Sequence, residues 1–137
     1  MKNFIVVVTS FMMLLALSGK SQSFMSVNHY GSTANDMGRG ICTDASGNMY
    51  MVGEYNDSIT FGSTVLRSSI YKSAFLVKYN ASGAVLWAKR FTGTNSGITA
   101  AKVRCDNAGN LYVAGTFFGI AKYDTVSTTI GVAGGTT

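Results

Sequence analysis

The feature that most constrains this 137-residue chain is an internal repeat. Segment 44–55, DASGNMYMVGEY, returns 62 residues later as segment 106–117, DNAGNLYVAGTF. Phe61 and Tyr123 stand at the same offset, so the similarity extends beyond the motif without a gap. A period of this length indicates stacked supersecondary units, because each unit of a repeat protein buries its faces against its neighbours.

Each copy of the motif reads as a tight β-hairpin. Asp-x-x-Gly-Asn lies between two apolar runs, and such a turn needs an Asx side chain as a cap and a Gly at positive φ. Asn80 to Gly83 has the same form. One unit of four strands is expected at 41–43, 49–55, 74–79 and 85–91, with a longer connection between the second and third. Parts of other units are expected as strands at 24–30, 98–105 and 111–117.

The strand pattern predicts sheets that are covered on both sides. Leu111, Val113 and Phe117 fall on one face of their strand, while Tyr112 and Ala114 fall on the other. An isolated antiparallel sheet would keep one polar face in water, whereas sheets stacked face to face bury both. After the N-terminal segment no stretch shows a helical period, so the expected class is all-β, with four-stranded antiparallel sheets in a radial array.

Residues 1–22 have the form of a secretory signal peptide. Lys2 precedes an apolar run over 4–17, and small polar residues from Ser18 onwards suit a cleavage site close to Gln22. The run is shorter than the roughly 20 residues that span a bilayer, so cleavage is favoured over an uncleaved membrane anchor. We therefore expect export, with no membrane span left after cleavage.

Three sequence elements that follow in order, GNMY at 47–50, FLVKY at 75–79 and LWAK at 86–89, carry a family resemblance. Together they resemble the β-propeller repeat of secreted bacterial proteins, called the SBBP repeat, over nearly the whole chain after residue 22. The resemblance implies blades of four antiparallel strands, commonly about seven to a ring. Members of that family are typically exported, and most have no assigned activity.

The expected organisation is a signal peptide, 1–22, followed by a partial propeller, 23–137. The propeller part divides into an incomplete blade 23–36, a full blade 37–97 and an incomplete blade 98–137. A ring needs about four to eight blades, so this chain cannot close one alone. We read it as the N-terminal piece of a longer protein. The alternative is a short product that is completed by self-association.

The charged residues predict no catalytic or metal site. The 11 Lys and Arg against 6 Asp and Glu are scattered along the chain, whereas a nucleic-acid surface would show a basic stripe. Asp44 and Asp106 could be offered as calcium ligands, but their spacing departs from a calcium loop and favours a turn role. His29 is the single histidine, with an expected packing or surface role. The remaining acids form no recurring pair for acid and base catalysis: Asp36, Glu54, Asp57 and Asp124.

Aromatic residues offer two different interpretations. A ring platform for sugar binding is one, but core packing is favoured because all of the candidates lie in repeated strands. These candidates are Tyr50, Phe75, Tyr79, Trp87 and Tyr112. Partner contacts are expected instead from residues placed in exposed loops, since loops on rigid scaffolds carry function. The loop candidates are Tyr55, Asn56, Tyr71 and Asn95.

Cys42 and Cys105 are an even pair in a chain expected to be exported, which permits a disulfide. Their positions in the repeat differ by one, so they point to opposite sheet faces. Packed sheets lie about 10 Å apart, whereas a disulfide needs Cα atoms within about 7 Å. Two buried free thiols are therefore expected, and a bridge would require the sheets to converge near the propeller axis.

These observations predict a function only at the level of class. The favoured hypothesis is a non-catalytic β-propeller scaffold or binding module that is secreted to the periplasm, cell surface or medium. Its partners would be a protein or glycan and further blades, with no nucleic acid, no metal and no cofactor. The alternative is the N-terminal propeller section of a larger exported enzyme, such as a glycan-active hydrolase.

Overall fold

The computed structural model describes residues 28–68, 70–93, 97–117 and 121–124, all of whose regular structure is β-strand, which confirms the all-β class. The expected signal peptide and most of the strand expected at 24–30 lie outside the described residues, and residues 28–30 are not in a strand. The strands form three antiparallel sheets, none of which closes on itself.

The four strands expected for the full blade are present and neighbour one another in chain order. They are β1 (Met37–Thr43), β2 (Met49–Tyr55), β5 (Ser73–Tyr79) and β6 (Val85–Gly93). A fifth strand, β9 (Ala121–Tyr123), pairs with the outer end of β6, where Phe91 stands opposite Tyr123. The sheet is therefore five-stranded, and the expectation of a four-stranded sheet was wrong because a strand of the following repeat extends it.

The connection expected between residues 55 and 74 contains a second hairpin. Its strands are β3 (Ser58–Phe61) and β4 (Thr64–Arg67), joined at Gly62 with φ of 57°. Alternation buries Ile59, Phe61 and Leu66 on one face. The sequence analysis missed this hairpin because four-residue strands give too short a pattern to separate from a loop.

The second copy of the motif forms the hairpin of β7 (Ile98–Cys105) and β8 (Leu111–Phe117). Its geometry repeats that of β1 and β2 in detail. Both pairs shift register at the same place, between Gly38 and Gly40 in β1 and between Ala100 and Lys102 in β7. Because the two bulges stand 62 residues apart, the repeat extends to the backbone.

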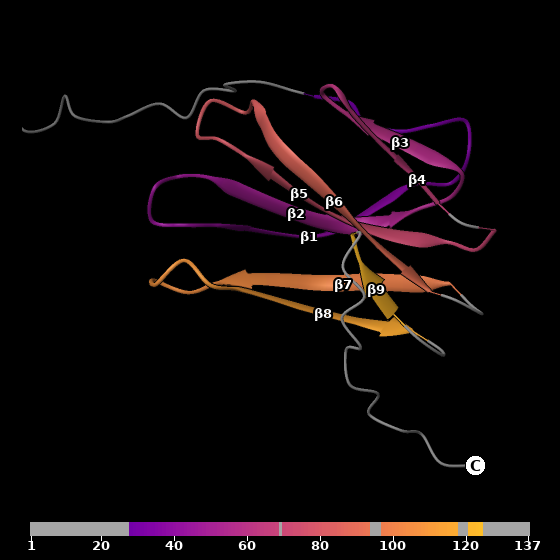
Figure 1. The fold of residues 1–137 in the computed structure, drawn as a ribbon. Coiled ribbons are helices and arrows are strands. Elements are labelled where there is room, and N and C mark those ends of the chain that lie inside the picture. Colours follow the sequence, from indigo (N-terminus) through magenta and orange to yellow (C-terminus); the bar gives the residue numbers. More distant parts are fainter. Residues whose placement is uncertain (1–27, 69, 94–96, 118–120, 125–137) are drawn as a thin grey trace, which may run out of the picture.

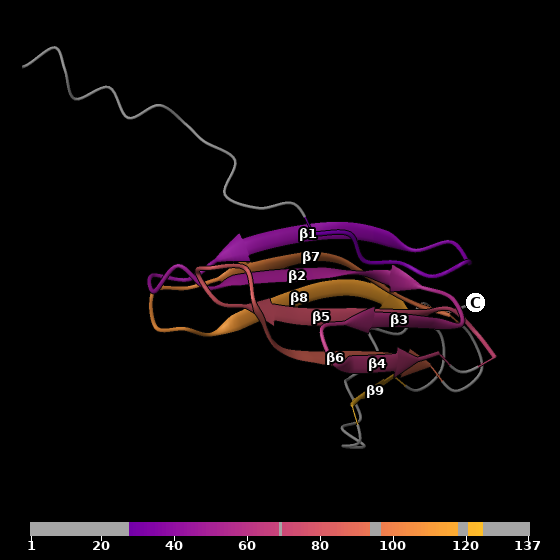
Figure 2. The same cartoon turned by 90° about the horizontal axis from the view of Figure 1, so that it is seen from above.

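The sheets form three layers, with the five-stranded sheet in the middle (Figures 1 and 2). The β3–β4 hairpin covers one face, where Phe61 packs on Phe75 with ring centroids 4.9 Å apart. The β7–β8 hairpin covers the other face, where Val103 packs in one cluster with Tyr50 and Val52. Both faces of the inner strands β2 and β5 are thus covered, as the strand pattern predicts, whereas the edge strand β1 stays largely exposed.

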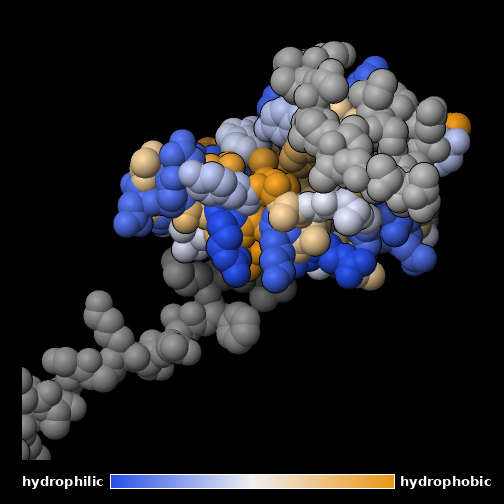
Figure 3. Space-filling model, turned by 90° about the horizontal axis from the view of Figure 1, so that it is seen from below, coloured by the Kyte–Doolittle hydropathy of each residue, from blue (hydrophilic) through white to orange (hydrophobic). Residues whose placement is uncertain are grey.

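The outward side of β8 has no covering layer among the described residues. Tyr112 is 60% exposed, whereas Tyr50, its equivalent in β2, is 4% exposed. The expectation that both faces of this strand are buried was therefore wrong: Leu111 and Phe117 pack against the core cluster, but Val113 and Ala114 are exposed. Figure 3, seen from the β7–β8 side, shows apolar residues gathered in the middle of this face between hydrophilic ones.

Candidate functional site

The turn between β1 and β2 is organised by one carboxylate. Oδ1 of Asp44 accepts hydrogen bonds from the backbone N–H groups of Ser46 and Asn48, each at 2.9 Å. Its Oδ2 accepts the side-chain amide of Asn48 at 2.9 Å and the hydroxyl of Tyr50 at 3.1 Å. Gly47 takes φ of 79°, which a residue with a side chain rarely adopts. Asp44 therefore caps a turn, which confirms the role expected for it.

The turn between β7 and β8 repeats this network atom for atom. Oδ1 of Asp106 accepts the N–H groups of Ala108 and Asn110, and its Oδ2 accepts the Asn110 amide and the Tyr112 hydroxyl. The hydrogen bond from the Asn48 side chain lowers the pKa of Asp44, and that from Asn110 lowers the pKa of Asp106. Both oxygens of each carboxylate thus accept hydrogen bonds from within the turn or from the Tyr that follows it.

The third turn shows which part of the network is essential. Oδ1 of Asn80 accepts the N–H groups of Ser82 and Ala84, as the aspartates do, and Gly83 has φ of 85°. A neutral amide is therefore sufficient to close the turn. In the two aspartate turns Oδ2 also accepts from the following Asn amide and Tyr hydroxyl, whereas the third turn has Ala84 and Leu86 at those positions.

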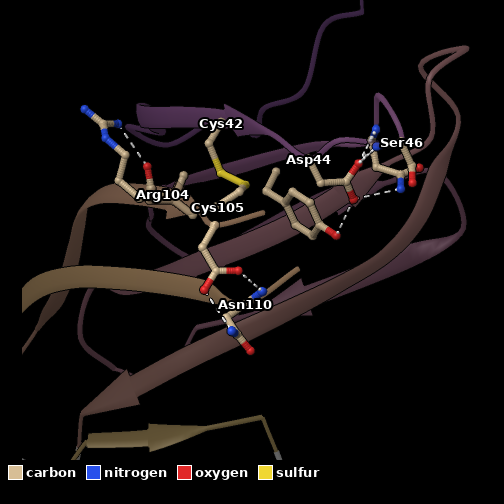
Figure 4. The surroundings of a disulfide bond; sticks show 10 residues. Cys42, Asp44, Ser46, Arg104, Cys105 and Asn110 are labelled. Carbon is tan, nitrogen blue, oxygen red and sulfur yellow. Dashed lines mark hydrogen bonds between the residues drawn. A yellow bond between two sulfur atoms is a disulfide. The ribbon is translucent and has the colours of Figure 1, made fainter. Parts of the chain in front are cut away.

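A disulfide joins Cys42 of β1 to Cys105 of β7, with Cα atoms 6.1 Å apart (Figure 4). The expectation of two free thiols was wrong, and the reason lies in Gly40. A Cβ on Gly40 would lie 3.2 Å from the Cα of Lys102, so the missing side chain allows β7 to approach β1 more closely than facing sheets normally do. Strands β1 and β7 therefore converge, and Cys42 and Cys105, near their C-terminal ends, come within bonding distance.

One acid of the central sheet is buried and paired. The side chain of Glu54 is 4% exposed, with Oε1 accepting from Arg39 and Oε2 lying 3.5 Å from Nζ of Lys72. The ion pairs connect β2 to the bulge of β1 and to the segment before β5. Because burial of an unpaired carboxylate is costly, the two cations make this position of Glu54 possible.

The other acids are dispersed over the molecule. Asp36 accepts the backbone N–H of Ser32, and Asp57 is in a turn with φ of 63°. Asp124 forms an ion pair with Lys89, and the hydrogen bond that Lys89 donates to the Asp124 carboxylate raises the pKa of that lysine. In the described part of the chain no three His, Cys, Asp or Glu side chains gather as a metal site would require. His29 is exposed, as a surface role predicts.

The candidate ring platform is divided between the core and the surface. Tyr50, Phe75 and Tyr79 are buried, and Trp87 packs on Tyr50 with ring centroids 6.1 Å apart. Burial raises the pKa of Tyr79 well above its usual value. Core packing is thus confirmed for these rings, whereas for Tyr112 it was wrong, because no strand or sheet beyond β8 covers it within the described residues.

The loop candidates also separate. Tyr55 was expected in an exposed loop, but it is the last residue of β2 and is fully buried against Phe75. This expectation was therefore wrong. Asn56 donates a hydrogen bond to the carbonyl of Asn35. Tyr71 is 38% exposed on the connection before β5. Asn95 lies outside the described residues.

Two hollows accompany the edges of the sheets. One of about 570 Å³ runs between β4 and the outer part of β6, with Arg67, Trp87 and Arg90 in its wall. Another, of about 270 Å³, lies beside β8 and is lined by Phe91, Val113, Phe117 and other apolar residues. The sequence analysis found neither. The pairing of Phe61 with Tyr123 in the repeat was the one signal for strand β9, which closes the second hollow.

Comparison with known proteins adds no further assignment. No protein-family model, curated protein or solved structure matches the chain. Within the residues that the structure describes, no helix has the length and apolar character to cross a membrane.

Proposed function

We propose that this chain is part of an exported, non-catalytic β-propeller repeat scaffold that binds a protein or glycan through loops at one end of its blades. One observation carries the proposal. Two copies of the same hairpin, with the same turn network and the same bulge, lie face to face and share one core cluster. Face-to-face stacking of similar sheets is how a propeller buries both sides of each blade.

The two ends of the sheets differ in a way that supports one of them as the binding end. The three Asx turns lie together at one end, where their side chains are committed to the turns (Figure 1). The opposite end carries longer connections, and there Ile70 is 89% exposed and Tyr71 is 38% exposed. Exposed apolar and aromatic loop residues on a rigid scaffold are typical of binding surfaces.

Export is tested by expressing the full chain in a bacterium and measuring the intact mass of the product outside the cytoplasm. The proposal expects a product that begins close to Ser23, after removal of residues 1–22. A full-length product that stays inside the cell contradicts export.

Binding is tested by screening the chain on an array of bacterial and host glycans and on extracellular matrix proteins. The proposal expects retention without turnover, and Ile70→Ser is expected to weaken it at least tenfold because an exposed apolar contact is lost. Ser82→Ala, in an exposed Asx turn at the opposite end, is the matched control and leaves binding unchanged. Cleavage of a retained glycan would contradict a non-catalytic role.

A further inference from the structure

The edge of β8 lacks, within the described residues, the second partner strand that its equivalent β2 has. In the first unit β2 is paired on both sides, by β1 and by β5, whereas β8 is paired only by β7. Every residue from Tyr112 to Thr116 is exposed, while the equivalent residues 50–54 of β2 are buried or half-buried. An unpaired strand edge is a template for another strand.

A hollow of about 270 Å³ lies on the inner side of that edge, with an apolar lining that includes Phe91, Val113 and Ala121. In the first unit the corresponding space belongs to side chains of β5. Phe75 and Val77 of β5 stand on the same side of the sheet as Met51 of β2, and Met51 is the equivalent of Val113. A strand added to β8 in the same way would direct its aromatic and Val side chains into the hollow.

Charge gives a second constraint on the incoming strand. Tyr50 stands opposite Lys78 of β5, whose Nζ lies 5.0 Å from the centre of the tyrosine ring. Tyr112 offers the same ring, with the Asp106 carboxylate bound to its hydroxyl, and its face is open. A cation on the incoming strand, opposite Tyr112, would complete the arrangement of the first unit.

We propose that the edge of β8 is a docking site for one antiparallel β-strand of the β5 type, in which an aromatic residue, Leu, Val, Lys and an aromatic residue follow one another. Its Lys lies opposite Tyr112 and its Val opposite Val113, in the register that joins β5 to β2. The occupant is a strand from another repeat. The inference rests on the proposed function, because it assumes that successive units are completed alike.

The test uses the full chain and a synthetic peptide of residues 72–92, which carries β5 and β6 as a hairpin. Amide hydrogen exchange of residues 111–117 is followed as the peptide is titrated. We expect saturable protection of the β8 amides. Tyr112→Ala in the chain is expected to weaken binding about two- to fivefold, the worth of an exposed cation–π contact. Val65→Ala, an exposed position of the β3–β4 hairpin on the opposite face of the central sheet, is the control and has no effect.

Two peptide variants separate specific docking from general adhesion. A peptide with Lys78→Ala should bind about two- to fivefold more weakly, and one with Val77→Asp at least tenfold more weakly, since a carboxylate would enter an apolar hollow. Equal binding of all three peptides would overturn the proposed register.

The two failures are distinguishable. If the peptide protects no β8 amide while β2 and β7 remain protected in the chain, the docking site is wrong and the stacked scaffold stands. If β2 and β7 themselves exchange at the rate of an unfolded chain, the stacked scaffold fails first, and the docking site with it.

Discussion

At the scale of single residues, the Asx turns show how a small group determines the path of the chain. Asp44 and Asp106 each accept four hydrogen bonds, two from backbone N–H groups and two from side chains. The neutral Asn80 accepts the same two backbone bonds and one from the Ser82 hydroxyl. Exchange of an aspartate for asparagine keeps the bonds to the backbone and therefore measures what the negative charge contributes.

Replacement of Asp44 should divide that contribution into two steps. Asp44→Asn keeps the Oδ1 acceptor, as in the third turn, and should lower the melting temperature slightly. Asp44→Ala leaves two turn N–H groups without their acceptor and should lower it clearly further. Thermal unfolding at neutral pH measures both, and an alanine variant as stable as the asparagine variant would contradict the turn role.

The pH dependence of this effect has a defined sign. The pKa of Asp44 is lowered in the folded chain below its usual 3.8, so the extra stability of the carboxylate is fully present above 3.8. It is lost as the pH falls through the lower folded value. The gap in stability between the natural chain and Asp44→Asn should therefore close in acid, which unfolding curves from pH 6 downwards would follow.

Gly53 of β2 stands opposite Gly38, where the bulge of β1 begins. A Cβ at this position would overlap the carbonyl oxygen of Met37 and lie 2.6 Å from Cζ of Phe75. Gly53→Ala should cost about 1–3 kcal/mol of unfolding free energy, as overpacking typically does. Gly38→Ala is the control, because its Cβ would meet only the sulfur of Met51 at 3.9 Å. Denaturant unfolding of both variants checks the contrast.

At the scale of elements, the sheet of one repeat is extended by a strand of the next. Strand β9 pairs with β6, and the repeat offset makes β9 the equivalent of β3. The contact that accompanies this pairing is the stack of Phe91 on Tyr123, with ring centroids 4.9 Å apart. In the first unit Phe61, the equivalent of Tyr123, meets Tyr30 at 5.1 Å. The same position of the repeat therefore makes an aromatic contact in both units.

Removal of the Tyr123 ring should loosen β9 without unfolding the sheet. Tyr123→Ala is expected to lose about 1 kcal/mol of local stability, which is typical of an aromatic pair. Amide exchange in β9 and at residues 91–93 of β6 should accelerate, while β1 and β2 stay protected. Lys122→Ala, with an exposed side chain on the same strand, is the control. Faster exchange throughout the sheet would show that β9 is not an independent element.

At the scale of the whole molecule, the disulfide is a covalent cross-link between the two units, in addition to the backbone that joins them. It joins residues 63 positions apart, and cross-linking a loop of that length restricts the unfolded chain by about 4 kcal/mol in the chain-entropy model. The Cys42→Ala, Cys105→Ala double variant should therefore lose about 2–4 kcal/mol of unfolding free energy. Denaturant unfolding of the oxidised chain and of the variant gives the difference directly.

Loss of the link should act mainly on the docking of the second unit. In the double variant, β7 and β8 should exchange faster than β2 and β5, because the hairpin is then held by apolar contacts with the central sheet and the hydrogen bond from the Ile98 N–H to the Lys72 carbonyl. A single Cys105→Ala variant should behave like the double variant. If the variants match the natural chain in unfolding free energy and amide exchange, the disulfide does not stabilise the docking of the second unit.

Local pattern was sufficient for the features that neighbouring residues decide. The Asp44 and Asp106 turns, strands β1, β2, β5 and β6 and the all-β class follow from turn chemistry and alternation, which act within about ten residues, and from the repeat. The hairpin of β3 and β4 was not predicted because its strands are short. The exposure of Tyr112 was not predicted because the repeat predicts strands around β8 that the described residues do not include.

The sequence by itself determined the hairpins, their turns and the period at which they recur, because these depend on backbone conformations set by Gly, Asp and Asn. Tertiary structure alone decided which segments meet. The disulfide depends on how closely β7 approaches Gly40, the fifth strand on where the chain returns after β8, and the burial of Tyr55 on the layer above it. Such contacts join residues distant in the chain, and no local pattern records the distance between two sheets.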